Sequence, residues 1–404
     1  MPGQFLSRKV LDLSPSATIA MNAKAKKLRA QGKDVISLSV GEPDFRTPRH
    51  ICEAAMRAVE DGQHFYTPSA GTPELRQAVA DTLSRDTGAS YSPDMVVVSP
   101  GAKYSIYLTL LALLDPGDEV LIPAPYWVSY PEIVRLCGGV PVLVATDGAV
   151  HPLSPAAVAK AITPRSKLLI LNSPSNPSGQ VVPPEDIGRL GALIEERGIW
   201  CLSDEVYNRL SYGREPPRSI AGVSPYCHAH TVVVNGCSKT YAMTGWRLGW
   251  LGARRELAAA VDSLQSQTTS NPSAITQAAA LAALQGPQDC VEEMRREFQI
   301  RRDLIHRLVN ALPGFSSACP EGAFYVFPDI SQLLGREIGG RLVNTPSDFC
   351  EIALERALVA MVSGEPFGTD RHVRISFAVR QETLSEACRR LGELLATGRV
   401  AGLD

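Results

Sequence analysis

Apolar runs of this chain end in residues whose side chains could do chemistry. The residues that follow these runs include a tryptophan, an asparagine, an aspartate, a lysine and an arginine: Trp127, Asn176, Asp204, Lys239 and Arg247. A lysine amine can condense with a carbonyl group, and an arginine guanidinium binds anions through paired hydrogen bonds. In open α/β sheets, ligands bind at the carboxyl ends of the strands. We therefore expect these side chains to share one site.

The first of these runs ends in a turn of small residues, Ser99-Pro100-Gly101-Ala102-Lys103, which opens a helical pattern. Backbone N–H groups at the start of a helix form an anion site that suits a phosphate group. The turn is not a Walker A loop, and G-x-G-x-x-G occurs nowhere in the chain. On its own the turn could be a plain connection, and Trp127 could be an ordinary core residue.

Two further runs end in polar segments with distinctive constraints. The residues from Asn172 to Gly179 contain two prolines and a glycine, which hold a backbone more rigidly than a simple connection requires. Asp204 follows a run of buried-type residues almost directly. Because a buried, unpaired carboxylate is costly, we expect Asp204 to have a cationic partner.

One ligand explains these features together: a flat anionic ring with a cationic nitrogen. Its phosphate would bind at the turn of Gly101, Ala102 and Lys103, and at Arg247. The ring would lie against Trp127, with Asn176 and Tyr207 at its oxygen and Asp204 at its nitrogen. Lys239 would form a Schiff base with its aldehyde. These are the properties of pyridoxal 5′-phosphate, whose protonated ring takes up electrons from substrate carbon atoms.

The elements that must position these residues alternate between strand and helix patterns. Several apolar, β-branched runs lack alternation, as expected for strands buried on both faces of a parallel sheet. These runs are Met95–Val98, Glu119–Ile122, Val140–Val144, Lys167–Leu171, Ile199–Leu202 and Thr231–Val234. Helical stretches such as Ala102–Leu114 and Glu185–Arg197 separate most of them. The pattern predicts an α/β fold with a large, doubly wound, mostly parallel sheet, to which Arg247–Leu251 could add an antiparallel strand.

Helix and strand ends near the sheet also carry signals. Thr72 and Pro73 are typical of an N-cap followed by proline at the first helical position, and Gly88 suits the far end.

After residue 285, apolar residues recur at helical spacing from about Gln288 to Leu312, which predicts one long helix. Beyond it, strand-like Ala323–Phe327 and Val373–Ala378 flank a helical stretch, Pro346–Arg356.

These patterns predict two domains, as expected for a chain of 404 residues. We expect residues 1–48 to form an N-terminal arm and part of a small domain. Residues 49–287 would form the large cofactor-binding domain. Residues 288–404 would form a linking helix and the small α+β domain at the C-terminus.

Composition excludes several classes of function. The formal net charge is −2 and no run of five like charges occurs, which argues against a nucleic-acid surface or a polybasic membrane patch. The nine cysteines are scattered singly, as in a reduced cytoplasmic protein. Cys227, His228 and His230 fit no common zinc spacing, so we expect a loop there without a metal. Without a signal peptide or an apolar run of about 18 residues, we expect a cytoplasmic protein.

At the residues that could hold the cofactor, the chain resembles the class I aminotransferases of pyridoxal-phosphate fold type I. It is most similar to the bacterial branch of aspartate and prephenate aminotransferases. The resemblance extends over nearly the whole chain. It is carried by residues 15–18, 41–45, 66–68, 125–130, 172–179, 203–207, 238–239, 243–247, 322–325 and 373–376.

The resemblance implies roles residue by residue. Lys239 would carry the cofactor and move the proton from the substrate's Cα, with Asp204 and Tyr207 as further catalytic residues. Arg374 would hold the substrate α-carboxylate, beside Gly41, Trp127 and Asn176. The strand pattern agrees, because Val373 and Ile375 face one way and Arg374 the other. Ser238 and, from a neighbouring subunit, Tyr66 would contact the phosphate. Thr18 and Lys103 would bind the distal carboxylate of the substrate.

The implied function is the transfer of an amino group from aspartate or glutamate to a 2-oxo acid by a homodimer with shared sites. Two departures bear on it: Gly236 stands where many relatives have a serine, and Ser14 where relatives that use prephenate tend to have a lysine. Neutral, aromatic or prephenate substrates therefore stay open. A lyase or cyclase could use the same carbanion chemistry. A regulator that senses the cofactor would need a DNA-binding domain, for which about 48 N-terminal residues are too few.

Overall fold

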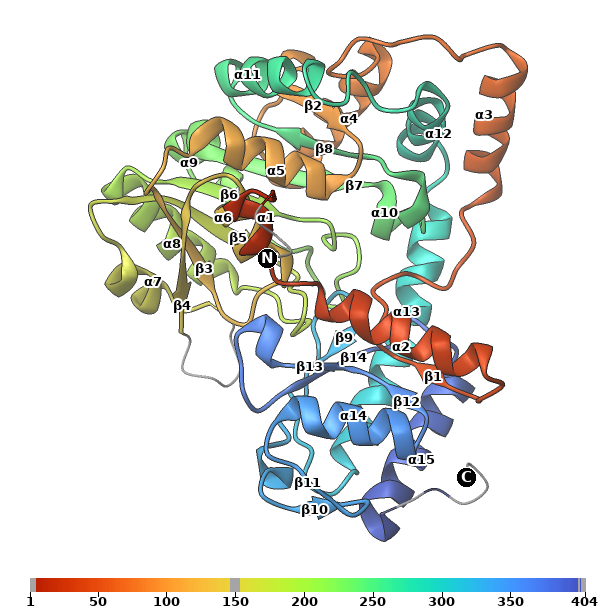
Figure 1. The fold of residues 1–404 in the computed structure, drawn as a ribbon. Helices are drawn as coiled ribbons and strands as arrows, with labels where there is room; N and C mark the ends of the chain where they lie inside the picture. The colour runs from red at the N-terminus through yellow and green to blue at the C-terminus, as the bar shows by residue number, and fades with distance from the viewer. Residues whose placement is uncertain (1–4, 146–152, 399, 401–404) are drawn as a thin grey trace.

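The computed structural model describes residues 5–145, 153–398 and 400, and its largest element is a seven-stranded sheet (Figure 1). The strand order is β2-β8-β7-β6-β5-β3-β4, in which β8 is antiparallel to both neighbours and all other pairs are parallel. The strands in chain order are β2 (Val96–Ser99), β3 (Glu119–Pro123), β4 (Val140–Val144), β5 (Ser166–Asn172), β6 (Trp200–Asp204), β7 (Thr231–Gly236) and β8 (Gly249–Gly252). The predicted fold class is confirmed, including the antiparallel strand.

The strand ends differ from the predicted ones by at most two residues, and β4 has the predicted bounds. The largest difference with a visible cause is at β8, which begins at Gly249 rather than at Arg247. Arg247 has a φ of 55°, in the left-handed region, so an extended strand can start only after it. This turn directs the Arg247 side chain back toward the start of α5 (Ala102–Leu113), where it lies against Gly101.

Helices cover both faces of the sheet, as a doubly wound fold requires (Figure 1). On one face, α5, α6 (Ser129–Leu136) and α11 (Arg255–Ser266) pack on residues such as Val120 and Ile170. The helices on the other face pack on Leu121, Leu169 and Val233. They are α3 (Arg49–Glu60), α4 (Pro73–Thr87), α7 (Pro155–Ala161), α8 (Pro184–Arg197), α9 (Pro225–His230) and α12 (Ala274–Gln285).

Two local predictions on these helices have different outcomes. The predicted start and end of α4 are confirmed, because the Thr72 side chain accepts a hydrogen bond from the Leu75 N–H and Gly88 has a φ of 74°. The loop predicted around Cys227 is wrong. Residues Pro225–His230 form α9, which Ser224 caps by accepting from the Cys227 N–H. Cys227 is fully buried there, so its apolar contacts outweigh the polar appearance of the stretch.

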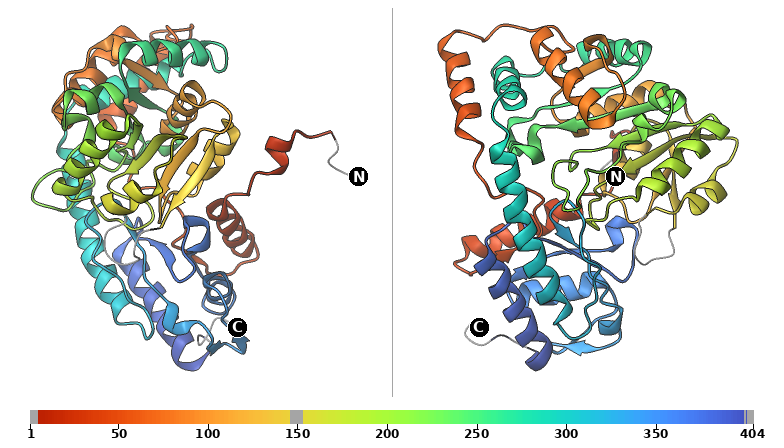
Figure 2. Two further views of the ribbon diagram at one scale, coloured as in Figure 1. Left: turned by 90° about the vertical axis from the view of Figure 1, so that its left-hand side faces the viewer. Right: turned by 180° about the vertical axis from the view of Figure 1, so that it is seen from behind.

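The C-terminal part of the chain packs around a second core. Its long helix α13 (Asp289–Asn310) runs from the sheet region to the far end of the molecule, as Figure 2 shows from behind. The predicted helix α14 (Pro346–Arg356) has the predicted bounds. The other elements are β9 (Tyr325–Val326), β10 (Glu337–Ile338), β11 (Arg341–Leu342), β12 (Val359–Ala360), β13 (Val362–Ser363), β14 (Val373–Ser376) and α15 (Gln381–Thr397). The division at residues 48 and 287 stays a prediction.

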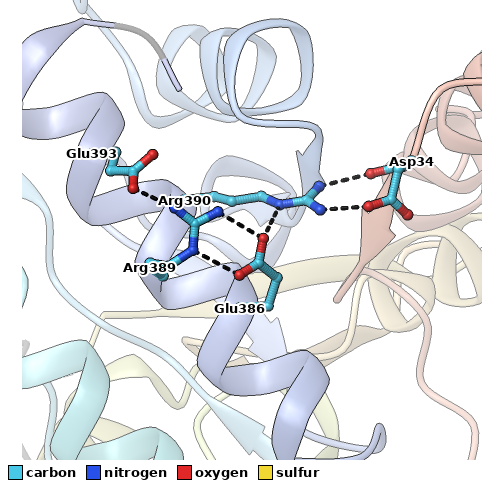
Figure 3. Close-up of polar contacts among 5 residues, drawn as sticks. All are labelled: Asp34, Glu386, Arg389, Arg390 and Glu393. Atoms are coloured by element: carbon cyan, nitrogen blue, oxygen red, sulfur yellow. Dashed lines mark hydrogen bonds and ion pairs between the residues drawn. The ribbon is translucent and has the colours of Figure 1, made fainter. Parts of the chain in front are cut away.

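Residues 17–38 lie against this C-terminal core. After α1 (Arg8–Leu11) and α2 (Ala17–Ala30), the short strand β1 (Ile36–Ser37) pairs in parallel with β12. The segment before β1 is joined to α15 by Arg390, which donates to the Asp34 carbonyl at 2.7 Å and to its carboxylate (Figure 3). The same guanidinium donates from Nε to Glu386 at 2.8 Å. This ion-pair cluster therefore joins the segment before β1 to α15.

Five short 3-10 helices and one short α-helix complete the described elements. The α-helix, α10 (Cys237–Thr240), follows β7 directly. The 3-10 helices are η1 (Pro93–Met95), η2 (Ile220–Gly222), η3 (Thr244–Trp246), η4 (Ser331–Leu333) and η5 (Glu365–Phe367). Among the residues that the structure describes, no helix has the length and apolar character that crossing a membrane demands. Within the same ranges no cluster of His, Cys, Asp or Glu could hold a metal ion.

Candidate functional site

A cavity of about 370 Å³ opens between the carboxyl ends of the strands and the C-terminal core. Its walls come from both regions, because β6 ends in Asp204 on one side and β14 contributes Arg374 on the other. All predicted site residues line it except Gly101 and Tyr66. Those that do are Thr18, Gly41, Ala102, Lys103, Trp127, Asn176, Asp204, Tyr207, Ser238, Lys239, Arg247 and Arg374.

Lys239 projects into this cavity from α10. Its Nζ donates a hydrogen bond to the Gly41 carbonyl at 2.6 Å. Burial lowers the pKa of Lys239 to about 8; nearby Glu42 opposes this shift and Arg374 adds to it. A lysine with such a pKa is partly uncharged near neutral pH, and only the uncharged amine can attack a carbonyl group.

Asp204 is a buried carboxylate that faces the same cavity. Burial raises its pKa to about 6, and a hydrogen bond from Tyr130 opposes the shift. The Tyr130 hydroxyl donates to Oδ2 at 2.7 Å, and the Val206 N–H donates to Oδ1 at 3.4 Å. Asp204 forms no ion pair with any residue in the described part of the chain, so the expected cationic partner, the ring nitrogen of a cofactor, stays a prediction. Its charge is therefore available to a ligand.

Arg374 is 2% exposed, and none of its partners in the described part of the chain is charged. Nη1 donates to the Asn176 side-chain oxygen at 3.0 Å, and Nη2 donates to the Ser39 carbonyl at 2.7 Å and reaches the Thr18 hydroxyl at 3.5 Å. Its Nε has no partner among the described residues. Burying a guanidinium without a carboxylate is costly, so this arrangement is typical of a site that receives an anion.

The turn predicted to bind phosphate closes the other end of the cavity. Gly101 has a φ of 98°, and a Cβ atom there would lie 2.6 Å from Arg247 Nη2. Any larger residue would push the guanidinium away from the start of α5. The N–H groups of the first turn of a helix have no partner within the helix, so they and Arg247 can face one anion.

Lys103 and Trp127 lie together on the wall next to this turn. Lys103 Nζ is 4.8 Å from the centre of the Trp127 ring, and burial lowers the pKa of Lys103, with Arg247 adding to the shift. Lys103 thus lies over a face of the Trp127 ring, against which we predicted the cofactor ring to lie. Its charge has no carboxylate partner within the described ranges.

The structure leaves Tyr66 outside the cavity. Its side chain is 89% exposed and lies beside residues of α12, such as Gln277, on another surface. Its neighbour Phe65 is also exposed, at 76%. The idea that Tyr66 reaches the site of a neighbouring subunit stays a prediction, as no second chain is present in the structure.

The lining also contains residues to which the sequence prediction gave no role, among them Glu42, Tyr130 and Tyr325. Tyr130 follows Trp127 by three residues, a spacing that puts both on one side of a helical turn, and their rings meet edge to face at 5.3 Å. That spacing could have indicated that Tyr130 belongs to the site. Tyr325 shares a hydrogen bond of 3.0 Å with Tyr207, a contact between distant segments that spacing does not reveal.

The charges around the cavity are unbalanced. Its described lining contains four cationic side chains, Lys103, Lys239, Arg247 and Arg374, and two carboxylates, Glu42 and Asp204. An excess of cations with low-dielectric walls attracts anions. The cavity is therefore suited to a ligand that carries more than one negative charge.

Comparisons with known proteins agree with this geometry. An aspartate aminotransferase of Geobacillus stearothermophilus is 44% identical, over 96% of this chain and 98% of the relative. An aspartate/prephenate aminotransferase of Nitrosomonas europaea is 42% identical, over 97% and 100%. The structure of the aspartate aminotransferase from Rhizobium meliloti has a TM-score of 0.93 and 41% identity, over 97% and 98%.

The structure of the Thermus thermophilus aspartate aminotransferase with maleate gives a TM-score of 0.91 and 43% identity, over 97% of this chain and all of that one. The family model for class I and II aminotransferases matches residues 33–391. These matches do not favour a lyase, a cyclase or a regulator. They confirm the resemblance inferred from the sequence motifs, and the chain belongs to the class I and II aminotransferases.

Proposed function

We propose that this aminotransferase takes the amino group from aspartate or glutamate and uses pyridoxal 5′-phosphate bound through Lys239. The observation that carries the proposal is Arg374, a buried guanidinium without a carboxylate partner in the described chain, in the same cavity as Lys239. An amino-acid substrate brings the missing carboxylate and places its amino group near the lysine. Planar, bidentate binding of a carboxylate is what arginine provides and lysine does not.

The residues present fit pyridoxal phosphate. The cradle between Gly101 and Arg247 would be filled by a Cβ atom, and Ala102, Lys103 and Ser238 border it, so these groups would hold the phosphate. Asp204 would pair with the ring nitrogen, Asn176 and Tyr207 would contact the ring oxygen, and Trp127 would cover a ring face. The bound cofactor supplies an aldehyde for amines and a protonated ring that takes up electrons.

Lys239 has two tasks in this proposal. Its amine holds the cofactor until substrate arrives, and once free it takes the proton from the substrate's Cα. A base works best when its pKa is near the working pH, and burial brings that of Lys239 to about 8. The Gly41 carbonyl, 2.6 Å from Nζ, limits where the amine can move, and the Gly41 N–H would assist Arg374 with the α-carboxylate.

Preference for an acidic substrate would come from Lys103 and Thr18. Both line the cavity, and Lys103 has no carboxylate partner in the described chain. They could bind the distal carboxylate of aspartate or glutamate. Two findings on relatives support this: several are named aspartate aminotransferases, and the Thermus structure is described with maleate, a small dicarboxylate.

We also propose a homodimer with shared sites, in which Tyr66 reaches the partner's phosphate site. Its support is the exposure of apolar and aromatic side chains that a monomer would bury. Phe65 and Tyr66 are 76% and 89% exposed, and Phe5 near α1 is 87% exposed. Figure 2 shows α1 standing out from the rest of the ribbon. Large exposed apolar groups of this kind mark interaction surfaces.

The test is a panel of the twenty amino donors with 2-oxoglutarate or oxaloacetate, followed by the absorbance of the cofactor and by the 2-oxo acid released. We expect the highest kcat/KM for aspartate and glutamate. Faster reaction with phenylalanine, alanine or a prephenate-derived donor would overturn the substrate assignment. Loss of the amino group without a matching 2-oxo acid would overturn transamination itself.

A further inference from the structure

Tyr130 of α6 and Asp204 of β6 share a hydrogen bond inside the protein. The Tyr130 hydroxyl donates to Asp204 Oδ2 at 2.7 Å, and the two residues are 1% and 5% exposed. We infer that Tyr130 is a positioning residue that keeps Asp204 ionised and aims its carboxylate at the ring nitrogen of bound pyridoxal phosphate. This inference rests on the proposed function, which gives Asp204 that role.

Among the described groups around Asp204, Tyr130 is the one that can orient its carboxylate and keep it ionised. The titratable groups facing it are Tyr130 from α6, Lys239 from α10, and Glu205 and Tyr207 from its own segment. Lys239 Nζ is bonded to the Gly41 carbonyl, and the Tyr207 hydroxyl is bonded to Tyr325. Among the described residues, Tyr130 is thus the one side chain that donates to the carboxylate. Without its hydroxyl, a single long backbone contact from Val206 would remain.

The Tyr130–Asp204 pair is held from both of its sides, at the Tyr130 ring and at the Asp204 backbone. The Tyr130 ring packs edge to face against Trp127, with ring centres 5.3 Å apart and planes at 85°. On the other side, the Asn172 side chain donates to the Asp204 carbonyl at 3.0 Å and fixes the end of β6. A hydroxyl and a carboxylate held at this distance form a charge-assisted bond, which is stronger than a neutral one. The pair therefore favours the ionised carboxylate in one orientation.

The first measurement is the affinity of cofactor-free, full-length protein for pyridoxal phosphate. The variants are Tyr130→Phe, Asp204→Asn and the double variant. Tyr126→Phe serves as the control, since Tyr126 is also buried but is not a hydrogen-bond partner of Asp204. We expect Tyr130→Phe to weaken binding by roughly tenfold to a hundredfold, the range for a hydrogen bond to a charged group. Tyr126→Phe should change it less than about threefold.

The second measurement is the stability of the cofactor-free protein between pH 5 and 8. Asp204 has a folded pKa of about 6, above its usual value, so its contribution to stability falls as pH rises and then levels off above that pH. Removing the Tyr130 hydroxyl raises this pKa further. The difference between wild type and Tyr130→Phe should therefore grow as pH rises above about 6. Glu205 titrates near pH 7 in both proteins, so its effect cancels in the difference.

The double variant separates positioning from packing. In the Asp204→Asn background, Tyr130→Phe should change neither the cofactor affinity nor the pH dependence. A loss of stability that is the same at every pH, or the same in both backgrounds, would mean that Tyr130 only packs and would overturn the inference. Failure of wild-type protein to bind pyridoxal phosphate would contradict the proposed function instead, and the pH measurement distinguishes the two.

Discussion

Two buried arginines of the C-terminal region differ in what they contact. Arg390 of α15 is 4% exposed and is bonded to the carboxylates of Glu386 and of Asp34, which lies in the segment before β1 (Figure 3). Arg374 of β14 is 2% exposed, and its partners are an amide oxygen, a carbonyl and a hydroxyl. A buried charge needs a countercharge. Arg390 finds it in carboxylates of its own chain, whereas Arg374 requires one from a ligand.

Two neighbouring carboxylates repeat this difference. Asp204 faces the cavity and accepts one side-chain hydrogen bond, from Tyr130. Glu205 points elsewhere and accepts from two hydroxyls, those of Ser203 at 2.8 Å and Ser219 at 2.6 Å. Both have raised pKa values because both are buried, to about 6 and about 7. Burial alone therefore does not mark the site. The residues that mark it face the cavity and lack partners of opposite charge.

The largest effect of breaking this pattern is expected at Lys239. Lys239→Ala should lower kcat/KM by at least about 10³-fold, since it removes both the amine that holds the cofactor and the base at Cα. The protein should fold, because Lys239 forms no ion pair in the described chain. Steady-state kinetics with aspartate measures the loss. Lys24→Ala, which removes a surface lysine paired with Glu351, is the control and should retain wild-type rates.

A smaller loss of kcat is expected at Asp204, and none of comparable size at its neighbour Glu205. Asp204→Asn should reduce kcat by about a hundredfold or more with little change in KM, as for an interaction needed in the transition state. Glu205→Gln keeps shape and hydrogen-bonding capacity away from the cavity, so kcat should stay within about threefold. A change confined to KM in Asp204→Asn would make Asp204 a substrate contact and contradict its proposed role.

Asp204 and Glu205 should each make the free energy of unfolding depend on pH, but over different pH ranges. Each has a folded pKa above its usual value, so the folded state holds its proton longer and stability falls as pH rises through that window. Asp204→Asn should remove the fall between about pH 4 and 6, and Glu205→Gln the fall between about pH 4.5 and 7. Each change is expected to be at most about 3 kcal/mol. Urea unfolding of the cofactor-free protein across pH measures it.

The smallest effect is expected at Lys103. Lys103→Ala should lower kcat/KM for aspartate by roughly tenfold to a hundredfold, the range for a hydrogen bond between charged groups. Activity on alanine or phenylalanine should fall much less, because those donors have no distal carboxylate. The ratio between donors is the measured quantity. Equal losses on acidic and neutral donors would assign Lys103 to the cofactor alone.

The strands, their buried character and the residues at their ends were predictable from local pattern. Apolar runs of four or five residues predict buried parallel strands, and Asn176, Asp204 and Lys239 follow such runs closely. The roles of Arg374 and Thr18 needed the family resemblance. Their contact joins residues 356 positions apart, which no local pattern contains.

Contacts of this long-range kind explain what sequence reasoning missed. The Tyr130 bond to Asp204 and the Lys239 bond to Gly41 each join segments that only the folded chain brings together. The helix at Cys227 was missed for another reason: its polar residues suggested a loop, while Ser224 capped it and burial of Cys227 stabilised it. Long-range contacts decided the first case, and a local cap together with burial decided the second.

The sharpest measurement replaces each of the two arginines by methionine and compares stability with ligand affinity. Arg390→Met should lower the free energy of unfolding by about 1–3 kcal/mol, because Asp34 and Glu386 lose their partner. Arg374→Met should lower it less, since the loss of its bonds to Asn176 and Ser39 is offset by the removal of a buried charge without a countercharge in the described chain. In protein loaded with pyridoxal phosphate, Arg374→Met should weaken maleate binding at least a hundredfold and Arg390→Met should leave it unchanged. Unaltered maleate affinity in Arg374→Met, with a stability loss like that of Arg390→Met, would contradict the proposal that Arg374 awaits a substrate carboxylate.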